Sequence, residues 1–573
     1  MLLLLGGGLT VFLIRWKPMI AQKLKDGVYN RSFGLYKLDF KDIGFNLLTG
    51  SANLYDVSLI PDTVVYNKLK MLRVAPANIF QVRLKKLQLN RIGLLTAYFK
   101  REINIKAIVL DNPSINMIHY KVEKRPEMLK EDQTLYQLIS NRIRSIDVNS
   151  IKIVDADFDY INGDNARKLH SVKHLSLYAN DFRVDSLTQF DTSRYYYAKD
   201  IGFELTGYKA LTKDKMYTMK VDTVNGSALQ QSIKVKGVQV IPMYPDLAFS
   251  RRYKYGKDRY DLKFNEIGFS QVDFALLNAK GDLRAGALKI GPAKVNIFVN
   301  RELPPPPGFD KVKNFPHVAL KRLPVSAIVD TVILNNVDVA YTEYNPISQK
   351  RGTVYFQDLS GNILNVTNDT VKLAKNNHAI ANLTAMVMKT SRINVQINFN
   401  LTDKDAAFSY NGNVAPMNMR VLNPMAKNMG LVEIESGQMQ KADFNILANA
   451  RGSSGRVHFY YTDLKIKLLK EGEAGAAPTK KGFLSFLANS LLIKDANPTN
   501  GEAVRTANVT FQRTPAASFF NLMWKSVFIG MREIVGLGAV PVKTPEEAME
   551  KIADKKQERK NKNKKDKDER KTD

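Results

Sequence analysis

Alternating carboxylates at Asp155, Asp157 and Asp159 are the pattern in this chain that most suggests metal chemistry. A calcium loop that begins at Asp155 needs Gly at its sixth position and Glu at its twelfth, but Tyr160 and Ala166 occupy those positions. Alternate residues of a β-strand point to the same side of the sheet. We therefore interpret the three carboxylates as the charged outer face of a strand.

Other residues that could carry chemistry are few. His170 and His174 are four residues apart, about 13 Å on a strand, which is too far to share a metal ion. The chain has no Cys, which excludes disulfides, thiolate metal sites and a Cys nucleophile. The Gly-Ser-Ser-Gly run at 452–455 lacks the glycine spacing of a nucleophile elbow and is typical of a turn. We therefore expect no enzymatic activity, no catalytic residue, no cofactor and no metal.

Lys and Arg outnumber Asp and Glu by 85 to 56, a formal net charge of +29 over 573 residues. Such an excess favours an anionic partner, either nucleic acid or an anionic membrane surface. The basic tail Lys555–Lys571 has no aromatic residue on which a base could stack, so nucleic acid is not expected. We expect the tail to be solvated and disordered, with contact to lipid head groups or other polyanions as the alternative.

Most of the chain consists of short segments in which apolar and polar residues alternate. This pattern predicts a mainly β protein with a few helices, built on a large antiparallel sheet, sandwich or barrel. The segments include Ser51–Ile60, Ile103–Leu110, Ile151–Tyr160, Val172–Val184, Ile233–Val240, Ala287–Val299, Val329–Tyr341, Val354–Val366, Ile380–Lys389, Ile393–Leu401 and Gly455–Leu469. Helical patterns occur at Ile92–Arg101, Pro126–Ile146, Met417–Asn428 and Phe483–Leu492.

Two strand pairs resemble each other across the chain. Ile151–Tyr160 aligns with Val332–Tyr341, and Val172–Val184 aligns with Val354–Val366, at an offset of about 181 residues. A shorter Ile-Gly-Phe phrase recurs at 43–45, 201–203 and 267–269. Common strand composition is the alternative origin of both similarities. A true duplication would make the fold one strand module repeated along the chain.

The strand expected at Ile151–Tyr160 has two faces that carry different side chains. Its odd positions, from Ile151 to Asp159, are expected to point outward, and its even positions from 154 are expected to point inward. With their counterparts in the second copy, the inward residues that are candidates to line a lipid groove are Val154, Ala156, Phe158, Tyr160, Val337, Val339 and Tyr341. A sheet that curls without closing would offer acyl chains a trough, at about 0.8 kcal/mol per buried methylene. A closed sandwich is the alternative that periodicity does not separate.

The N-terminal segment Leu2–Ile14 is apolar and is followed by Arg15, Trp16 and Lys17. Thirteen helical residues reach about 20 Å, which is short of the roughly 30 Å hydrocarbon core. We predict an uncleaved single-pass anchor that extends into Pro18–Ile20 or begins further upstream. A signal peptide and a buried core helix are the alternatives, and the basic residues after the segment leave its orientation open.

A strongly amphipathic helix is expected at Phe519–Val535, just before Gly536 and Gly538. It either covers the open end of the sheet or docks on a membrane surface or partner protein. The candidate docking residues are Phe519, Phe520, Met523, Trp524, Val527, Phe528 and Met531.

The four-proline run Pro304–Pro307 cannot sit inside a strand ladder and predicts a linker. The expected divisions of the chain are a membrane anchor with an amphipathic helix (1–30), a first β-rich module (31–303), a Pro-rich linker (304–315), a second β-rich module (316–470), a helical cap (471–540) and a basic disordered tail (541–573).

Several of these segments resemble the AsmA-like family of Gram-negative envelope proteins. The resemblance rests on the apolar start, IGFNLLTGSANLYDVSLIPD (43–62), the short helix followed by INIKAIVLDNPSINMI (103–118), and GRVHFYYTDLKIKLLK (455–470). It implies an inner-membrane anchor and a periplasmic body, with a long twisted antiparallel sheet curled into an elongated apolar groove. It also implies a role in phospholipid transport and outer-membrane homeostasis. The short anchor and the long basic tail depart from the family's pattern.

Two functional hypotheses follow. In the first, the protein is not an enzyme and binds or guides phospholipid acyl chains in its β-groove. In the second, it is a structural or adaptor protein of the envelope with a closed β-fold that organises other envelope proteins. The expected partners are therefore membrane phospholipids, with other envelope proteins as the alternative.

Overall fold

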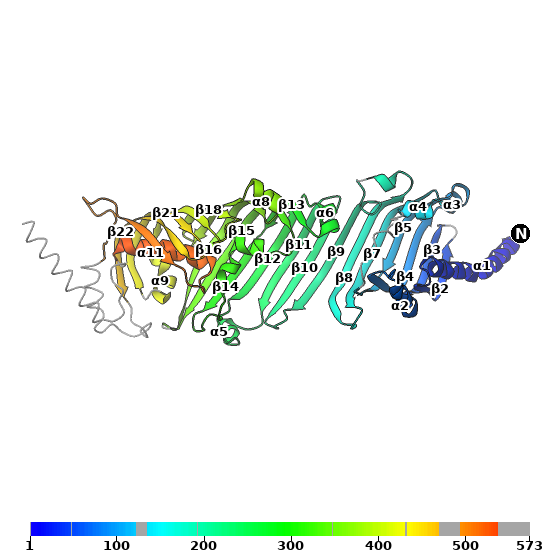
Figure 1. The fold of residues 1–573 in the computed structure, drawn as a ribbon, viewed down its shortest axis with the longest axis horizontal. Coiled ribbons are helices and arrows are strands. Elements are labelled where there is room, and N and C mark those ends of the chain that lie inside the picture. The colour runs from blue at the N-terminus through cyan, green and yellow to red at the C-terminus, as the bar shows by residue number, and fades with distance from the viewer. Residues whose placement is uncertain are drawn as a thin grey trace, which may run out of the picture. The chain divides into compact units, whose positions relative to one another are not determined.

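The computed structural model describes residues 2–46, 49–121, 134–191, 193–346, 348–429, 432–468 and 493–536. These residues form a mainly β structure whose 23 strands belong to a mixed sheet (Figure 1). The prediction of a mainly β protein is confirmed. The helix expected at Phe483–Leu492 and the basic tail lie outside the described residues. Of the helix expected at Pro126–Ile146, residues 126–133 also lie outside them, and the described part forms a helix only at Leu135–Ile139.

The chain forms two compact units, each described here by itself. Unit 1 comprises Met1–Ala210 and Lys220–Lys236, and unit 2 comprises Leu211–Met219 and Gly237–Asp573. From the N-terminus, the first elements are α1 (Leu2–Arg31), β1 (Tyr36–Asp39), β2 (Asp42–Asn46), β3 (Ser51–Pro61), α2 (Thr63–Met71), β4 (Asn78–Ile92), α3 (Leu94–Lys100), β5 (Glu102–Asp111), β6 (Ser114–His119), α4 (Leu135–Ile139), β7 (Ser145–Asn162), β8 (Lys168–Val184), η2 (Thr188–Phe190) and β9 (Ala198–Leu211).

Both units contribute residues to β10 (Tyr217–Ser227) and β11 (Ser232–Pro242). Unit 2 continues with α5 (Asp246–Ser250), β12 (Arg259–Ser270), α6 (Phe274–Lys280), β13 (Leu283–Ile290), β14 (Ala293–Asn300), η3 (Lys311–Asn314), α7 (Pro316–Lys321), β15 (Ala327–Asn345), β16 (Lys350–Thr367), α8 (Thr370–Lys375), β17 (His378–Val387), β18 (Ser391–Asn400), β19 (Phe408–Val414), β20 (Met417–Asn418), η4 (Met419–Leu422), α9 (Asn423–Met429), β21 (Val432–Ala448), β22 (Gly452–Leu468), β23 (Thr506–Gln512) and α11 (Phe519–Val535).

The sheet is not antiparallel throughout, so that part of the prediction is wrong. In unit 1, β5 and β6 pair antiparallel with successive halves of β4, and both pair parallel with β7. They act as one long strand broken at Pro113, which has no N–H to donate to a ladder. Unit 2 repeats the arrangement: β13 and β14 lie on β12 and run parallel to β15, with a break at Pro292.

Each parallel pairing requires a crossover connection, because a tight turn joins only antiparallel strands. In unit 1 the crossover leads from β6 to β7 and contains α4. In unit 2 it leads from β14 to β15 and contains η3 and α7. Pro304–Pro307 lie in this second crossover, so the structure places the proline run within unit 2 rather than between the two compact units.

A one-residue bulge interrupts the pairing of β7 with β8. From Ile153 to Ala156 the chain advances three residues, while their partners Leu177 and Leu175 are two residues apart. Asp155 takes up the extra residue with a φ of 55°, and its backbone N–H donates to Ser176 Oγ at 3.1 Å. The bulge shifts the alternation of all residues that follow it.

This shift corrects the predicted faces of the strand. Ile151 and Ile153, expected to point outward, lie on the same face as Ala156 and Phe158. Val154, expected to point inward, lies on the opposite face, where 38% of its surface is exposed. Strict alternation failed because a bulge residue was counted as an ordinary strand residue.

The same bulge occurs in the second copy and supports the duplication. From Leu334 to Val337 the chain again advances three residues against two on β16. Asn336, 181 positions after Asp155, has a φ of 51°, and its N–H donates to Ser360 Oγ at 3.0 Å. The Ile-Gly-Phe phrase falls in β2, β9 and β12, which are not equivalent strands, so it does not mark the repeat.

Small residues let α11 lie directly on the sheet of unit 2. A Cβ atom added at Gly530 would lie 2.7 Å from Val457 of β22 and 2.8 Å from Val509 of β23. Ser526, one turn earlier, is buried and shares a 2.6 Å hydrogen bond with Ser453. Only a residue without a side chain allows this helix–strand distance.

We expect Gly530→Ala to destabilise unit 2 by about 1–3 kcal/mol, because overpacking outweighs the gain in helix propensity. The matched control is Gly27→Ala in α1, where an added Cβ has no neighbour within 4 Å. That variant should melt at the wild-type temperature or above in a thermal denaturation experiment. An equal rise in the melting temperature of both variants would contradict the close packing of α11 against the sheet.

Candidate functional site

Half-buried apolar side chains form rows across one side of unit 1, which we call apolar face 1. Strand register places these residues side by side, because paired residues of neighbouring strands point to the same face. The rows comprise Leu87, Leu110, Ile153, Leu177 and Phe203 in the first, Leu89, Ile108, Ile151, Ala179 and Ile201 in the second, and Val82, Ile115, Phe158 and Val172 in the third.

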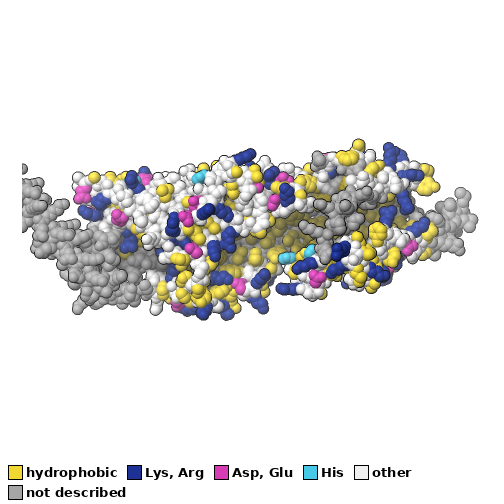
Figure 2. Space-filling view, in the orientation of Figure 1, with side chains coloured by type: hydrophobic (Ala, Val, Ile, Leu, Met, Phe, Trp, Pro, Cys, Tyr) yellow, Lys and Arg dark blue, Asp and Glu magenta, His cyan; other side chains and the backbone are white. Residues whose placement is uncertain are grey.

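These rows remain partly open to solvent. Leu177, in the middle of the first row, is 37% exposed, and its partners on either side, Ile153 and Phe203, are only half-buried. At one corner, Ile20 and Ala21 of α1 pack on the face beside Leu87 and Leu110. In the space-filling view, hydrophobic side chains gather in the hollowed parts of the surface, with Lys and Arg side chains along the rims (Figure 2). A continuous, half-covered apolar surface of this kind is suited to contact with another apolar molecule.

The equivalent face of unit 2 meets α11 at Tyr341. Val337, Val339 and Tyr341 follow one another on one face of β15, and Val337 and Tyr341 are buried. The ring of Phe520 lies 5.1 Å from that of Tyr341 and 5.3 Å from that of Phe356 on β16. In Figure 1, α11 lies across the strands of unit 2 from β22 towards β16. This part of the face is therefore covered by the chain itself.

The seven residues proposed for docking occupy two sides of α11. Phe519 packs among Phe315, Phe399 and Phe408, with ring distances of 4.9–5.7 Å. Met523, Val527 and Met531 also pack against the core of unit 2. Phe520, Trp524 and Phe528 follow one another at four-residue spacing and are half-buried. The structure thus places this helix as a cover of the sheet, which is the first of the two interpretations considered.

A buried polar cluster joins α11 to β15 and to the end of β14. Glu343, 4% exposed, accepts hydrogen bonds from Arg301 Nε at 3.2 Å, Tyr341 Oη at 2.6 Å and Asn521 Nδ2 at 3.3 Å. Burial opposes ionisation of Glu343, but the hydrogen bond and charge of Arg301 outweigh it and hold the pKa of the carboxyl below its usual value. The hydrogen bond from Asn521 Nδ2 to Glu343 therefore ties α11 to β15 at this point.

Lys525 lies on the same side of α11, one turn after Asn521. It is half-buried, and burial lowers its pKa despite the nearby charge of Glu343. Among the described residues no carboxylate comes within ion-pair distance of Lys525 Nζ. Glu343 is thus paired with Arg301, and its charge acts on Lys525 only from beyond ion-pair distance.

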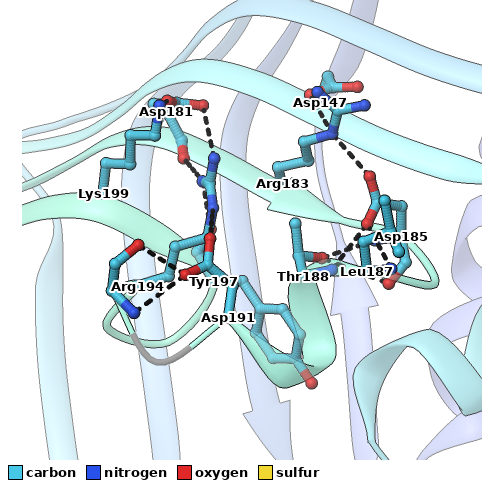
Figure 3. Close-up of polar contacts among 11 residues, drawn as sticks. Asp147, Asp181, Arg183, Asp185, Leu187, Thr188, Asp191, Arg194, Tyr197 and Lys199 are labelled. Carbon is cyan, nitrogen blue, oxygen red and sulfur yellow. Dashed lines mark hydrogen bonds and ion pairs between the residues drawn. The ribbon is translucent and has the colours of Figure 1, made fainter.

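A second polar cluster fastens the ends of β7, β8 and β9 in unit 1 (Figure 3). Arg183 Nε lies 2.7 Å from Asp185 and 3.6 Å from Asp147, and Arg194, with a side chain 7% exposed, pairs with Asp181 and Asp191. Burial raises the pKa of Asp147, although Arg183 opposes this shift. Because basic residues already neutralise these carboxylates, we interpret the cluster as structural. In the described part of the chain, no three His, Cys, Asp or Glu side chains are arranged to hold a metal ion.

Four of the residues first considered for metal chemistry have structural partners. Asp155 lies at the bulge and its carboxylate is 2.7 Å from His174 Nδ1, while Asp159 pairs with Lys168 at 2.6 Å. His170 stacks against Tyr160 with ring centroids 6.2 Å apart. The alternation rule missed the His174–Asp155 contact, because both residues have positive φ angles and interrupt their strands.

The start of the chain forms the continuous helix α1 through Pro18. In the part of the chain that the structure describes, no helix has both the length and the apolar character of a membrane span. The predicted anchor stays a prediction. No family model matches the chain, and no curated protein matches it.

His317 gives unit 2 a pH-dependent element. The ring is 2% exposed and lies 5.2 Å from Phe399 and 5.9 Å from Phe408, so burial lowers its pKa. Below about pH 6.5 the His317 ring binds a proton in the unfolded chain, whereas in the folded chain it does so only at lower pH. The stability that the neutral ring provides is therefore present above that pH and is lost as pH falls through the lowered pKa.

We expect the urea midpoint of the wild type to fall between pH 7.5 and pH 5.5 by more than that of His317→Leu. Each unit of pKa depression corresponds to about 1.4 kcal/mol of this difference. Parallel pH profiles of the two proteins would show that His317 does not contribute.

Proposed function

We propose that the protein is a non-enzymatic envelope protein that binds or guides phospholipid acyl chains on apolar face 1. The observation that carries this proposal is the set of three aligned apolar rows whose side chains are only half-buried. Each methylene that such a surface removes from water contributes about 0.8 kcal/mol, so an acyl chain is held without specific polar chemistry. Strongly basic character suits a protein that works beside anionic lipid head groups.

The resemblance to AsmA-like proteins supports the same proposal and extends it to a location. We place the body in the periplasm, held to the inner membrane by a single-pass N-terminal anchor, with a role in lipid transport or outer-membrane homeostasis. In this proposal the sheet curls into an elongated groove, and the duplicated module lengthens its apolar surface.

Mass spectrometry of co-purified lipid tests the proposal. The full chain is purified from a Gram-negative host in mild detergent, washed extensively, and extracted for lipid. We expect reproducible phospholipid at near-stoichiometric amounts, retained after detergent exchange, while a host membrane protein of similar size carried through the same washes loses most of its lipid. A well-folded, lipid-free protein would contradict the lipid-binding function.

A second candidate is the structural or adaptor function, which the filled part of unit 2 favours. Its largest core contains Phe315, Phe459 and Tyr461, and α11 covers the strands there. A core packed in this way between helix and strands is suited to presenting an outer surface to a partner protein. Lipid-free protein that retains envelope partners in cross-linking experiments would support this candidate.

A further inference from the structure

The side of α11 that faces β15 carries polar groups without partners inside an apolar setting. Trp524 Nε1 and Asn521 Oδ1 are buried, and neither has a hydrogen-bond partner among the described residues. Asn521 is 0% exposed. Leaving a buried N–H donor or an amide oxygen unsatisfied costs about 1–3 kcal/mol each, so such groups normally meet a ligand or water.

The same place has more positive than negative charge. Arg301 is committed to Glu343, whereas Lys525 has no carboxylate of its own. The nearby Asp258 is occupied by Lys311 at 2.7 Å, and Asp310 is occupied by Arg513 at 2.6 Å. A half-buried ammonium group without a counter-charge is unfavourable unless an anion binds beside it.

The geometry brings these features to one side of the helix. Asn521, Trp524 and Lys525 are spaced by three and four residues, so they share one helix face. Lys525 Nζ lies 6.0 Å from the centroid of the Trp524 indole ring, and the ring of Phe528 lies 5.7 Å from that indole. A group of polar side chains bordered by aromatic rings suits a ligand that has both a charged and an apolar part.

We propose that Lys525, the indole N–H of Trp524 and the amide oxygen of Asn521 form a binding site for a phosphodiester head group. Lys525 and Trp524 donate hydrogen bonds to the phosphate oxygens, and Asn521 Oδ1 accepts one from a hydroxyl of the head group. Phe520 and Phe528 contact the first methylenes of the acyl chains. The site rests on the proposed function, because its ligand is the same kind of lipid, but it lies in unit 2 and is separate from apolar face 1.

Trp524 provides a direct reporter of binding. The chain has two Trp residues, so in a Trp16→Phe background all tryptophan emission comes from Trp524. The full chain is titrated with three probes: dihexanoyl phosphatidylglycerol, dihexanoylglycerol and inorganic phosphate. The first has head group and chains, the second has chains alone, and the third is the free anion.

The test variant is Lys525→Gln and the charge-retaining variant is Lys525→Arg. The matched control is Arg532→Gln, which removes a positive charge from an exposed position of the same helix. Lys525→Gln should fold at least as well as the wild type, because it removes a half-buried charge. The melting temperature of each variant without ligand checks this.

We expect Lys525→Gln to weaken phosphatidylglycerol binding about tenfold or more, since a charge-assisted hydrogen bond is lost. Lys525→Arg and Arg532→Gln should keep affinities within about threefold of wild type, and dihexanoylglycerol should bind all four proteins equally. Unchanged phosphatidylglycerol affinity in Lys525→Gln, with both lipids bound, would overturn the head-group site and leave the proposed function intact. Binding of inorganic phosphate but of neither lipid would show that the site takes a free phosphate ion, and it would overturn the assignment to a lipid head group. Absence of any change in Trp524 emission with all three probes would overturn the head-group site, and the lipid extracted from the full chain would then decide the proposed function separately.

Discussion

Phe158→Asp should reduce co-purified phospholipid to less than about a tenth of the wild-type amount. Phe158 lies in the third row of apolar face 1, between Ile115 of β6 and Val172 of β8. A carboxylate there either loses its hydration under an acyl chain or keeps its water and prevents the chain from binding. The measurement is the molar ratio of extracted lipid to protein.

Val154→Asp is the matched control for this substitution. It introduces the same carboxylate on the same strand, four residues earlier, but on the opposite face of the sheet. Its lipid content should equal that of the wild type. Loss of lipid in both variants would show that charge on β7 acts through stability, which thermal denaturation of the two proteins would reveal. Retention of lipid in Phe158→Asp would place the binding surface elsewhere.

Arg301→Met should destabilise unit 2 by about 3–5 kcal/mol, because it leaves Glu343 buried without its counter-charge. The double variant Arg301→Met/Glu343→Met should recover part of this loss, since it removes the uncompensated charge as well. Chemical denaturation of the wild type and the two variants measures both effects. A double variant less stable than the single variant would contradict the assignment of the cost to the unpaired carboxylate.

The effect of Arg301→Met should also depend on pH. In the wild type Arg301 holds the pKa of Glu343 below its usual value, so this stabilisation is present at neutral pH and is lost only as pH falls through the lowered pKa. In the variant burial dominates and raises the pKa of the carboxyl, so protonation relieves the destabilisation as pH falls. The difference between the two proteins should therefore be smaller at pH 5 than at pH 7.

Local periodicity was sufficient to predict most of the β-structure. The alternating segment Val329–Tyr341 falls within β15, and all but the last residue of Ile393–Leu401 falls within β18. The repeat of about 181 residues appears again in the matching bulges of β7 and β15. The parallel pairs were missed, because the direction of a strand relative to its neighbours is set by the crossover connection and not by the alternation within the strand.

The candidate site was predicted less completely. Phe158 and Tyr341 were identified because they belong to clear alternating segments. Val154 was assigned to the wrong face, because nothing in the alternating sequence around Asp155 indicates that this residue has a positive φ. The cluster of Arg301, Glu343 and Asn521 was missed, because these residues are 42 and 178 positions apart and only the folded chain brings them together.

The broken strands and paired bulges make the repeat a self-contained length of chain. Asp155 and Asn336 occupy the same point of successive copies, so an insertion or deletion of one full copy joins strands in matching phase. A one-residue change within a strand would instead turn the later side chains of that strand to the other face of the sheet. Relatives of this protein are therefore expected to differ in length by whole copies, and a shortened version made by removing one copy should keep its hydrophobic residues on the correct side.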